Sequence, residues 1–315
     1  MSCDLTIIAP IYNEELNIPS LFDRLSKVIN KLEIKSEILF VNDGSRDRSM
    51  ELIRELSKAH SHVKYVDLSR NFGHQVAVSA GIDHAAGNYI AIIDADLQDP
   101  PELIPEMYSK MKEGFDVVYA KRRSRKDKNV LKKFAYKFFY RMLSRISSIS
   151  IPLDTGDFRI ISSKVAGLLS KMPEKEKFLR GQIAWIGFRQ TFVEYDRDAR
   201  LQGEPGYSYK KLFKLALDGI TSFSNLPLRF ATFAGMIVSA ISFLLILYAL
   251  YSHFFLRSAT PKGWASLMIS VLFIGGIQLL SIGIIGEYLS RISTNVRNRP
   301  LYIVGDSNAV LRSDK

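Results

Sequence analysis

The sequence predicts an α/β domain with a mostly parallel sheet, followed by interfacial helices and a pair of membrane-spanning helices. Three observations support this prediction. Apolar runs alternate with helical patterns over residues 4–120, as in strands joined by crossover helices. Composition changes sharply after Arg229, where two long stretches contain no charged side chain. Between these parts, basic residues are interleaved with large apolar ones.

The composition limits the classes of function. The 315 residues suffice for one large domain or two smaller units. An excess of Lys and Arg (43) over Asp and Glu (32) gives a net charge of +11, which favours nucleic acid, lipid head groups or phosphorylated substrates as partners. The single cysteine, Cys3, excludes an intramolecular disulfide and is compatible with a reducing compartment. The N-terminus opens directly into a strand-like run, so no signal peptide is expected.

Each element of the α/β part has its own signal. Five short apolar runs predict strands at Leu5–Ala9, Glu37–Val41, Lys64–Leu68, Tyr89–Ile93 and Val117–Ala120. Three amphipathic segments predict helices at Glu15–Leu32, Ser49–Ala59 and His74–Ala85. Ligands of such sheets bind beyond the carboxyl ends of the strands. Neither a dinucleotide-binding G-x-G-x-x-G nor a Walker loop is present, which argues against a dehydrogenase and a P-loop ATPase.

The run from Ile90 to Asp99 is the most informative stretch. Four apolar residues predict a buried strand, and Asp94 and Asp96 follow at alternate positions. In an extended backbone, alternate side chains leave on one face. Two acids on one face repel each other unless a cation lies between them, and a hard divalent ion also bridges to substrate phosphates. The stretch therefore predicts a metal that holds a diphosphate, with a solvated turn as the alternative.

Two uncharged runs predict transmembrane helices. Phe230–Leu256 and Gly263–Gly286 contain no Asp, Glu, Lys or Arg, and each exceeds the roughly 20 residues that span a bilayer. The alternative is a pair of buried helices in a large soluble core. The short link Arg257–Lys262 predicts a hairpin, and the basic residues outside it place both termini in the cytoplasm. Glycines in the second run permit close helix packing, within the hairpin or between subunits of a homo-oligomer.

Two further segments predict basic amphipathic helices at the membrane surface. Val130–Ile146 and Tyr209–Phe223 interleave Lys and Arg with Leu and Phe, as helices lying among lipid head groups do. The alternative is a solvated face over a core stripe. Basic aromatic helices can also bind nucleic acid, but two membrane spans argue against that partner.

Taken together, several motifs resemble those of polyprenyl-phosphate glycosyltransferases. This branch of glycosyltransferase family 2 has the GT-A fold and includes dolichol-phosphate mannose synthase and bacterial bactoprenol glucosyltransferases. The resemblance covers the chain to about Asn298, including the two spans. The motifs are Pro10-Ile11-Tyr12-Asn13-Glu14, Asn42-Asp43-Gly44-Ser45, Ser69-Arg70-Asn71-Phe72-Gly73, Asp94-Ala95-Asp96-Leu97-Gln98-Asp99-Pro100-Pro101 and Asp154-Thr155-Gly156-Asp157-Phe158-Arg159.

The resemblance implies a role for each matching position. Asp157 is implied to be the catalytic carboxylate. Residues implied to bind the nucleotide-sugar donor are Pro10, Tyr12, Glu14, Asp43, Asp94 and Ala95. Residues implied to surround Mg²⁺ or Mn²⁺ are Asp94, Asp96 and Gln98. Residues implied to pair with donor or acceptor phosphates are Arg122, Arg159 and Arg200.

Some positions have simpler alternatives. Asp43 can form an ordinary turn, Asp157 and Arg159 a surface ion pair, and His74 a helix cap. The chain also departs from the family's pattern at Gly203–Gly206, where many bacterial relatives have G-E-S-K, which weakens the assignment of Arg200. Gln182–Trp185 lacks the arginine of the Q-x-x-R-W motif of processive synthases, and two spans are too few for a polymer channel.

The implied reaction is inverting, metal-dependent transfer of a hexose from a nucleotide sugar to polyprenyl phosphate at the cytoplasmic face of a bacterial plasma membrane. The expected donor is UDP-glucose and the expected acceptor is undecaprenyl phosphate; the alternative donors are GDP-mannose and other UDP-sugars. The alternative function is a non-catalytic nucleotide-sugar-binding membrane protein. The expected organisation is a GT-A (Rossmann-like) catalytic domain, an interfacial helix, two transmembrane helices and a cytoplasmic tail. Their ranges are 1–207 (with an amphipathic helix at 130–147), 208–228, 229–290 (helices at 230–256 and 264–287) and 291–315.

Overall fold

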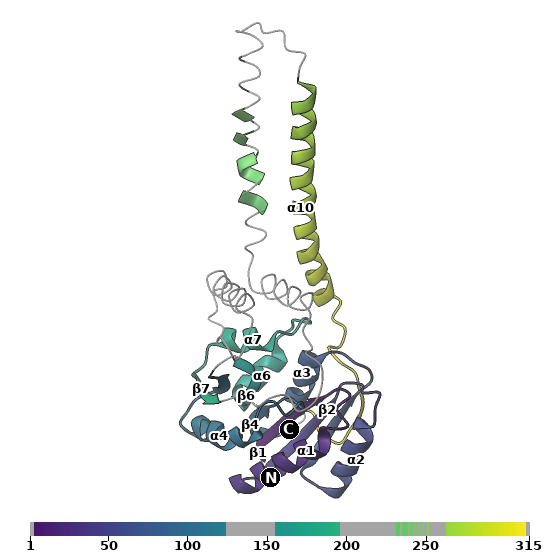
Figure 1. The fold of residues 1–315 in the computed structure, drawn as a ribbon, viewed down its shortest axis with the longest axis vertical. Coiled ribbons are helices and arrows are strands. Elements are labelled where there is room, and N and C mark those ends of the chain that lie inside the picture. Colours follow the sequence, from purple (N-terminus) through teal and green to yellow (C-terminus); the bar gives the residue numbers. More distant parts are fainter. Residues whose placement is uncertain are drawn as a thin grey trace. The chain divides into compact units, whose positions relative to one another are not determined.

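The computed structural model describes residues 3–123, 155–195 and 263–312, together with short stretches and single residues between 231 and 251 (Figure 1). The chain divides into two compact units. The first comprises residues 1–144, 149–208 and 299–315, and the second comprises residues 145–148 and 209–298. The predicted amphipathic helices at 130–147 and 208–228 lie outside the described residues.

Among the described residues, eight strands form one mixed sheet in the order β7-β5-β6-β4-β1-β2-β3-β8. The strands are β1 (Cys3–Ile11), β2 (Ser36–Asn42), β3 (Val63–Leu68), β4 (Gly87–Ile92), β5 (Val117–Arg122), β6 (Thr155–Ser162), β7 (Gln190–Tyr195) and β8 (Val304–Ser307). The pairs β1–β2, β1–β4, β2–β3 and β5–β7 are parallel, whereas β6 and β8 run antiparallel to their neighbours. The predicted α/β sheet and its five strands are confirmed.

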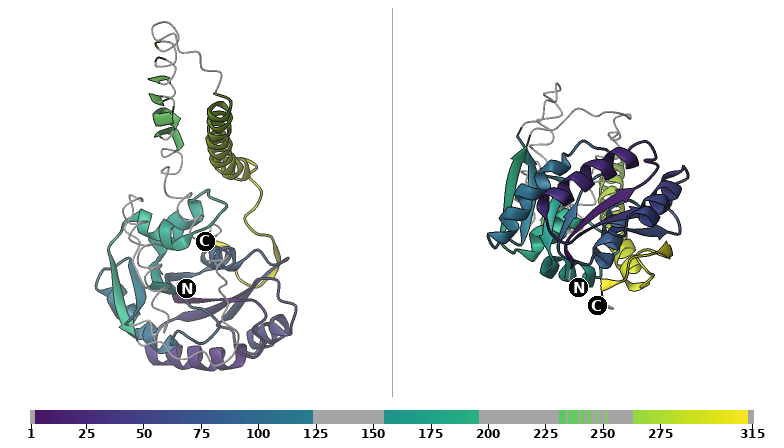
Figure 2. Two further views of the ribbon diagram at one scale, coloured as in Figure 1. Left: turned by 45° about the horizontal axis from the view of Figure 1, so that its top comes forward. Right: turned by 90° about the horizontal axis from the view of Figure 1, so that it is seen from below.

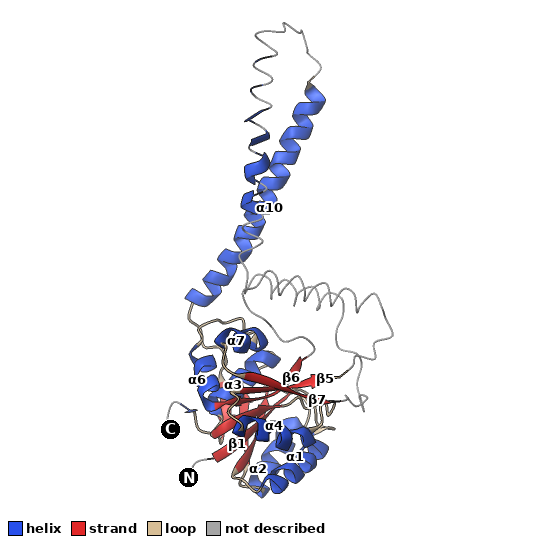
Figure 3. Ribbon diagram, turned by 90° about the vertical axis from the view of Figure 1, so that its left-hand side faces the viewer, coloured by secondary structure: helices blue, strands red, loops and turns tan. Residues whose placement is uncertain are grey.

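Helices cover both faces of the sheet (Figure 3). The helices of the first unit are α1 (Ile18–Leu32), α2 (Ser49–Ala59), α3 (His74–His84), the 3₁₀ turn η1 (Pro101–Leu103), α4 (Ile104–Lys112), α6 (Ser163–Lys171) and α7 (Leu179–Ile186). One core layer contains buried residues of α1, α2 and α4, and the other contains those of α3, α6 and α7. Strand β1 serves both layers because Ile7 and Ile8 point to opposite faces.

The amphipathic pattern of α1 shows how a helix is directed onto this sheet. Its buried residues Ile18, Leu21, Leu25 and Val28 recur every three or four positions and therefore form one stripe. The helix ends where Glu33 adopts a left-handed conformation with φ of 50°. This turn returns the chain to the sheet, where β2 pairs with β1.

An edge strand comes from the end of the chain. β8, drawn in yellow in Figure 2, pairs antiparallel with β3. Its Asp306 accepts hydrogen bonds from Arg54 Nη2 at 2.9 Å and from the Tyr65 hydroxyl at 3.0 Å. The predicted tail at 291–315 thus includes a strand of the eight-stranded sheet, which the sequence did not predict.

The second unit contains α10 (Trp264–Val296). Within it, Phe273–Val296 is the one stretch in the described part of the chain that is long and apolar enough to cross a membrane, by length and composition alone, with a mean hydropathy of 1.4. The span predicted at 264–287 coincides with most of α10, but the helix continues to Val296. The span predicted at 230–256 lies largely outside the described residues, so the two-helix hairpin is not confirmed.

Candidate active site

The carboxyl ends of the parallel strands and the first residues of β6 meet at one edge of the sheet. β6 runs antiparallel to both β4 and β5, so its beginning stands beside the ends of these neighbours. Ile92 of β4 pairs with Arg159 of β6. Two residues further along, the same register brings Asp94 and Asp157 to one edge. The topology thereby joins two carboxylates that are distant in sequence.

Asp157 is held by two arginine side chains. Arg159 Nη2 donates to Oδ1 at 2.8 Å, and Arg180 donates from Nε to Oδ1 at 3.0 Å and from Nη2 to Oδ2 at 3.1 Å. Burial acts to raise the pKa of Asp157, but Arg180, His74 and Arg159 outweigh it and hold the pKa well below its usual range. Asp157 is therefore a stable anion and a weak base.

Arg159 lies beneath Asp157 and is 1% exposed. Its Nε and Nη2 also donate to the backbone carbonyls of Asp157 and Gly156, at 3.0 and 3.1 Å. A guanidinium enclosed in this way has its donors directed into the protein. The placement indicates that Arg159 supports Asp157, whereas its Nη1 has no hydrogen-bond partner among the described residues and its contact with a phosphate stays a prediction.

His74, the first residue of α3, lies between the two carboxylates. Its Nε2 is 3.5 Å from Asp94 Oδ1 and 3.6 Å from Asp157 Oδ2. Burial acts to lower the pKa of His74, but the carboxylates of Asp157 and Asp94 outweigh it and raise that pKa. Gly73, with φ of 102°, makes the turn into α3 that delivers the ring to this point. A protonated His74 would stabilise both anions.

Asp94 has the less compensated charge. Its Oδ1 is buried and accepts no hydrogen bond from any described residue. Burial is the main reason that the pKa of Asp94 is raised to about 6; the carboxylates of Asp157, Asp99 and Asp96 add to this, and His74 opposes it. The site therefore contains one carboxylate that two arginines bind and one that lies near His74 but whose Oδ1 accepts no hydrogen bond from a described residue.

The predicted metal ligands lie just beyond β4, which ends at Ile92. Asp94 and Asp96 were expected to leave one face of an extended backbone, with a turn as the alternative. Asp96 lies in a turn, and the following Leu97 has φ of 57°. The turn is fixed because the Gln98 amide donates to Asp96 Oδ1 at 3.2 Å. No group of three or more His, Cys, Asp or Glu side chains forms a complete metal site among the residues that the structure describes.

Asp43 binds backbone rather than facing open solvent. Only 3% of it is exposed, and its Oδ1 and Oδ2 accept from the amides of Phe72 and Gly73 at 2.7 and 2.9 Å. Burial raises the pKa of Asp43, although both amides act to lower it. Next to it, Gly44 has φ of 65°, and a Cβ there would lie 2.4 Å from the carbonyl carbon of Arg70. Asp43 therefore fixes the loop at residues 69–73.

The other predicted donor residues lie around the same edge. Pro10 is buried in β1 opposite Val41, and Ala95 is 5% exposed. Tyr12 is 43% exposed. Glu14 accepts from Asn17 Nδ2 at 2.5 Å, next to the start of α1. Of this set, Tyr12 presents the most surface to a ligand.

Arg122 ends β5 and is tied to two buried groups. Its Nε donates to the Tyr195 hydroxyl at 3.1 Å, and its Nη2 lies 3.5 Å from Asp99 Oδ1. The Tyr195 hydroxyl also donates to Asp99 Oδ1. The side chain of Arg122 is 18% exposed, so it reaches the surface from a fixed base. Arg200, the third predicted phosphate ligand, lies outside the described residues.

Comparison with known proteins gives the family. The model for "Glycosyl transferase family 2" matches residues 6–168. The chain belongs to glycosyltransferase family 2. This glycosyltransferase is 50% identical to the "Uncharacterized glycosyltransferase YkcC" of Bacillus subtilis (strain 168), over 97% of this chain and 94% of that protein. It is 38% identical to the "Bactoprenol glucosyl transferase" of Shigella phage SfII, over 96% of this chain and 98% of that protein.

A solved structure of glucosyl-3-phosphoglycerate synthase from Mycobacterium tuberculosis has a TM-score of 0.46 at 15% identity, over 70% of this chain and 76% of that one. A likeness of this size carries no argument about ligands. The family match, together with the mixed sheet, confirms the GT-A-like fold of the glycosyltransferase.

Four side chains at the site of the glycosyltransferase have positions that sequence reasoning did not predict. They are His74, Asp99, Arg180 and Tyr195. For His74 the sequence leaves open a helix cap, a packing role or contact with substrate, and Asp99 lies in the predicted metal motif without an assigned role. Arg180 and Tyr195 had no local signal, because an arginine early in a short helix and a tyrosine ending a strand are common. The pairing of β7 with β5 brings Tyr195 to the site, and the start of α7 brings Arg180 there.

Proposed function

We propose that this glycosyltransferase transfers glucose from UDP-glucose to the phosphate of undecaprenyl phosphate, a polyprenyl phosphate. The observation that carries the proposal is the 38% identity, over nearly the whole of both chains, to proteins named bactoprenol glucosyl transferase. The paired carboxylates Asp94 and Asp157 at the ligand-binding edge of the sheet support it. The reaction takes place at the cytoplasmic face of a bacterial plasma membrane.

The chemistry of the acceptor agrees with the state of Asp157. The second pKa of a phosphate monoester is about 6, so the attacking oxygen is largely ionised near neutral pH. A strong general base is therefore unnecessary, and the lowered pKa of Asp157 makes it a poor one. In this proposal Asp157 orients the acceptor and the groups around it, and the acceptor oxygen displaces the nucleoside diphosphate in line, with inversion at the anomeric carbon.

The residues after β4 fit a divalent metal, Mg²⁺ or Mn²⁺. Asp94 offers a buried carboxylate oxygen that accepts no hydrogen bond from described residues, and Asp96 and Gln98 add oxygen atoms from the same turn. Hard divalent ions take such oxygens and complete their shell with water and substrate phosphates. When bound, the ion neutralises charge that develops on the leaving diphosphate. His74, 3.5 Å from Asp94, adds positive charge at the same point when protonated.

The loops at this edge of the sheet supply the groups that bind the nucleotide-sugar donor. Asp43 holds the 69–73 loop through two amides, while the exposed ring of Tyr12 is suited to contact a base or ribose. Arg122, fixed by Asp99 and Tyr195, directs a guanidinium toward the surface, where its planar fork suits a phosphate. Donor recognition thus combines a fixed backbone with a few exposed side chains.

The apolar helix α10 supports a membrane location. Large side chains on it, such as Leu279 at 71% and Ile282 at 63%, are exposed. A row of exposed apolar residues on a helix of this length is costly in water and favourable in lipid. Attachment to the bilayer would keep the enzyme on the surface in which its acceptor lies, with its two spans and both termini as predicted from the positive charges.

The proposal is tested with the purified full-length protein in detergent, labelled nucleotide sugars and undecaprenyl phosphate. We expect a lipid-linked glucose with UDP-glucose in the presence of Mn²⁺, loss of product with EDTA, and recovery on adding Mn²⁺ back. NMR of the product reports the configuration of the anomeric carbon. If the lipid product instead carried label from GDP-mannose or another UDP-sugar, that nucleotide sugar would be the donor in place of UDP-glucose.

Site variants make the test specific. Asp96→Asn is expected to reduce turnover strongly, whereas Asp23→Asn, which alters an exposed ion pair with Lys27, should leave it unchanged. Nucleotide-sugar binding without any product, across all donors and both metals, would favour a non-catalytic binding protein and overturn the proposal.

A further inference from the structure

Arg180 is one of the site residues that the sequence did not predict, and among them it makes the most specific contact. Its Nε and Nη2 donate to the two oxygens of Asp157 at 3.0 and 3.1 Å. A two-point contact of this kind fixes the plane of a carboxylate as well as its position. A lysine, which presents a single point charge, cannot reproduce it.

The other partners of Asp157 leave its orientation to Arg180. Arg159 binds only Oδ1 with its side chain, from the protein interior, at 2.8 Å. His74 is 3.6 Å from Oδ2. Without Arg180, the carboxylate would keep one strong hydrogen bond and could rotate about it. Arg180 is thus the partner that holds Oδ2 at hydrogen-bonding distance.

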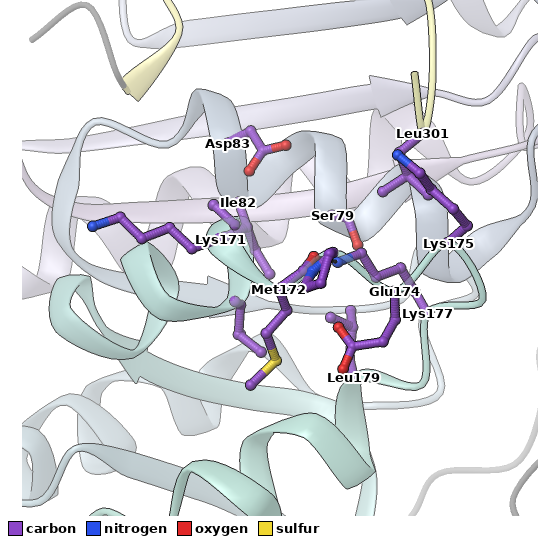
Figure 4. Close-up of a pocket in the computed structure, with 13 residues that line it drawn as sticks. Ser79, Ile82, Asp83, Lys171, Met172, Glu174, Lys175, Lys177, Leu179 and Leu301 are labelled. Atoms are coloured by element: carbon purple, nitrogen blue, oxygen red, sulfur yellow. Dashed lines mark hydrogen bonds between the residues drawn. The ribbon is translucent and has the colours of Figure 1, made fainter. Parts of the chain in front are cut away.

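The contacts that hold the start of α7 also indicate that Arg180 positions Asp157. The preceding residue, Leu179, begins α7, and its amide donates to Gln75 Oε1 of α3 at 3.2 Å. Gln75 directly follows His74, so one contact ties the start of α7 to the helix that delivers the imidazole. Beside this contact lies a cavity of about 210 Å³ between α3 and the segment that joins α6 to α7 (Figure 4). Leu179 lines this cavity, so packing around it is incomplete. The hydrogen bond from its amide to Gln75 therefore helps to hold the start of α7 in place.

We propose that Arg180 is a positioning residue for glycosyl transfer, which acts by holding the Asp157 carboxylate in one orientation. The inference rests on the proposed function, in which Asp157 orients the acceptor. Arg180 acts through Asp157 and does not itself bind the acceptor phosphate. Its loss should lower kcat, because misplacing a catalytic group by about 1 Å can cost about 100-fold in rate.

Truncation of Arg180 should leave the protein folded. The side chain is 31% exposed, whereas the neighbouring Leu179 and Ile183 supply the core contacts of α7. Asp157 would retain Arg159 as its buried counter-charge. Truncation of Arg159 would instead remove a fully buried side chain together with its hydrogen bonds to the backbone carbonyls of Asp157 and Gly156, so Arg180 is the better position for the test.

The experiment compares Arg180→Met, Arg180→Lys, Asp157→Asn and the double variant Arg180→Met/Asp157→Asn in full-length protein. The matched control is Arg189→Met, because Arg189 is exposed and its guanidinium lies over the ring of Phe115, 5.0 Å from the centroid. We expect Arg180→Met to lower kcat about 100-fold with KM for undecaprenyl phosphate changed less than about threefold. Arg180→Lys should recover only part of the loss, and Arg189→Met should resemble the wild type.

The double variant separates positioning from direct binding. If Arg180 acts through Asp157, adding Arg180→Met to Asp157→Asn should cost less than about threefold in kcat. A full additional 100-fold loss, or a raised KM for the acceptor at unchanged kcat, would overturn the inference. If the wild type makes no product, the proposed function fails. Thermal unfolding of the wild type, Arg180→Met, Asp157→Asn and the double variant still measures the coupling between Arg180 and Asp157. Additive changes in Tm there would also refute the inference.

Discussion

Replacing Asp43 by Asn should destabilise the sheet unit before it affects chemistry. Asp43 accepts hydrogen bonds from the backbone amides of Phe72 and Gly73. Because Asp43 is 3% exposed, water cannot take over these hydrogen bonds when the carboxylate is replaced. Asn keeps one acceptor oxygen and turns an NH₂ group toward the second amide. One hydrogen bond to a charged group, worth about 1.5–3 kcal/mol, is lost. The ionised carboxylate carries a desolvation cost, which its raised pKa reflects, so we expect a net loss of about 2 kcal/mol.

A loss of this size is measurable as a shift in Tm. For a unit of about 200 residues, 2 kcal/mol corresponds to a decrease of about 4–8 °C. The assay is thermal unfolding of the ligand-free protein in detergent, followed by near-UV circular dichroism, with Asp23→Asn as the exposed control. Nucleotide-sugar affinity is measured below the transition. A variant that unfolds with the wild type yet fails to bind nucleotide would show that Asp43 contacts the donor instead of stabilising the loop.

Three other outcomes follow from the geometry. Gly44→Ala should destabilise by about 2–4 kcal/mol in urea unfolding, because φ is positive and the new Cβ would lie 2.4 Å from Arg70. Tyr302→Phe should cost about 1 kcal/mol in the same assay, through loss of the 2.8 Å hydrogen bond to Asp83 that anchors the C-terminal segment. Asp157 has a lowered folded-state pKa, so its stabilisation is complete above the unfolded pKa of about 4 and is lost as pH falls further. The Tm difference between wild type and Asp157→Asn should therefore shrink as pH falls below about 4, where the carboxylate of Asp157 becomes protonated.

The parallel half of the sheet could be predicted because its signals are local. Buried strands such as β1 are short apolar runs, and α1 carries a stripe with helical spacing, so both were visible without knowledge of the fold. The rule that ligands bind at the carboxyl ends of strands then pointed to Asp43 and Asp94.

The antiparallel strands could not be predicted in the same way. β6 and β8 are defined by partners that lie far away in sequence, and no local pattern specifies such pairing. The pairing of β6 decides what surrounds Asp157, so the roles of Arg159 and Arg180 were invisible. The turn after β4 shows a smaller error, since Leu97 adopts φ of 57° against the usual preference of a non-glycine residue.

The two carboxylates at the edge of the sheet differ in a way that predicts which of them needs a metal. Asp157 receives three hydrogen bonds from arginines, whereas Asp94 Oδ1 is buried and accepts none from described residues. A divalent ion should thus bind where charge is uncompensated. Titration of Mn²⁺ by electron paramagnetic resonance should show affinity reduced at least about 10-fold in Asp94→Asn and nearly unchanged in Asp157→Asn. Equal losses in the two variants would mean that the ion lies between the carboxylates, and Asp157 would then have to release an arginine on binding it.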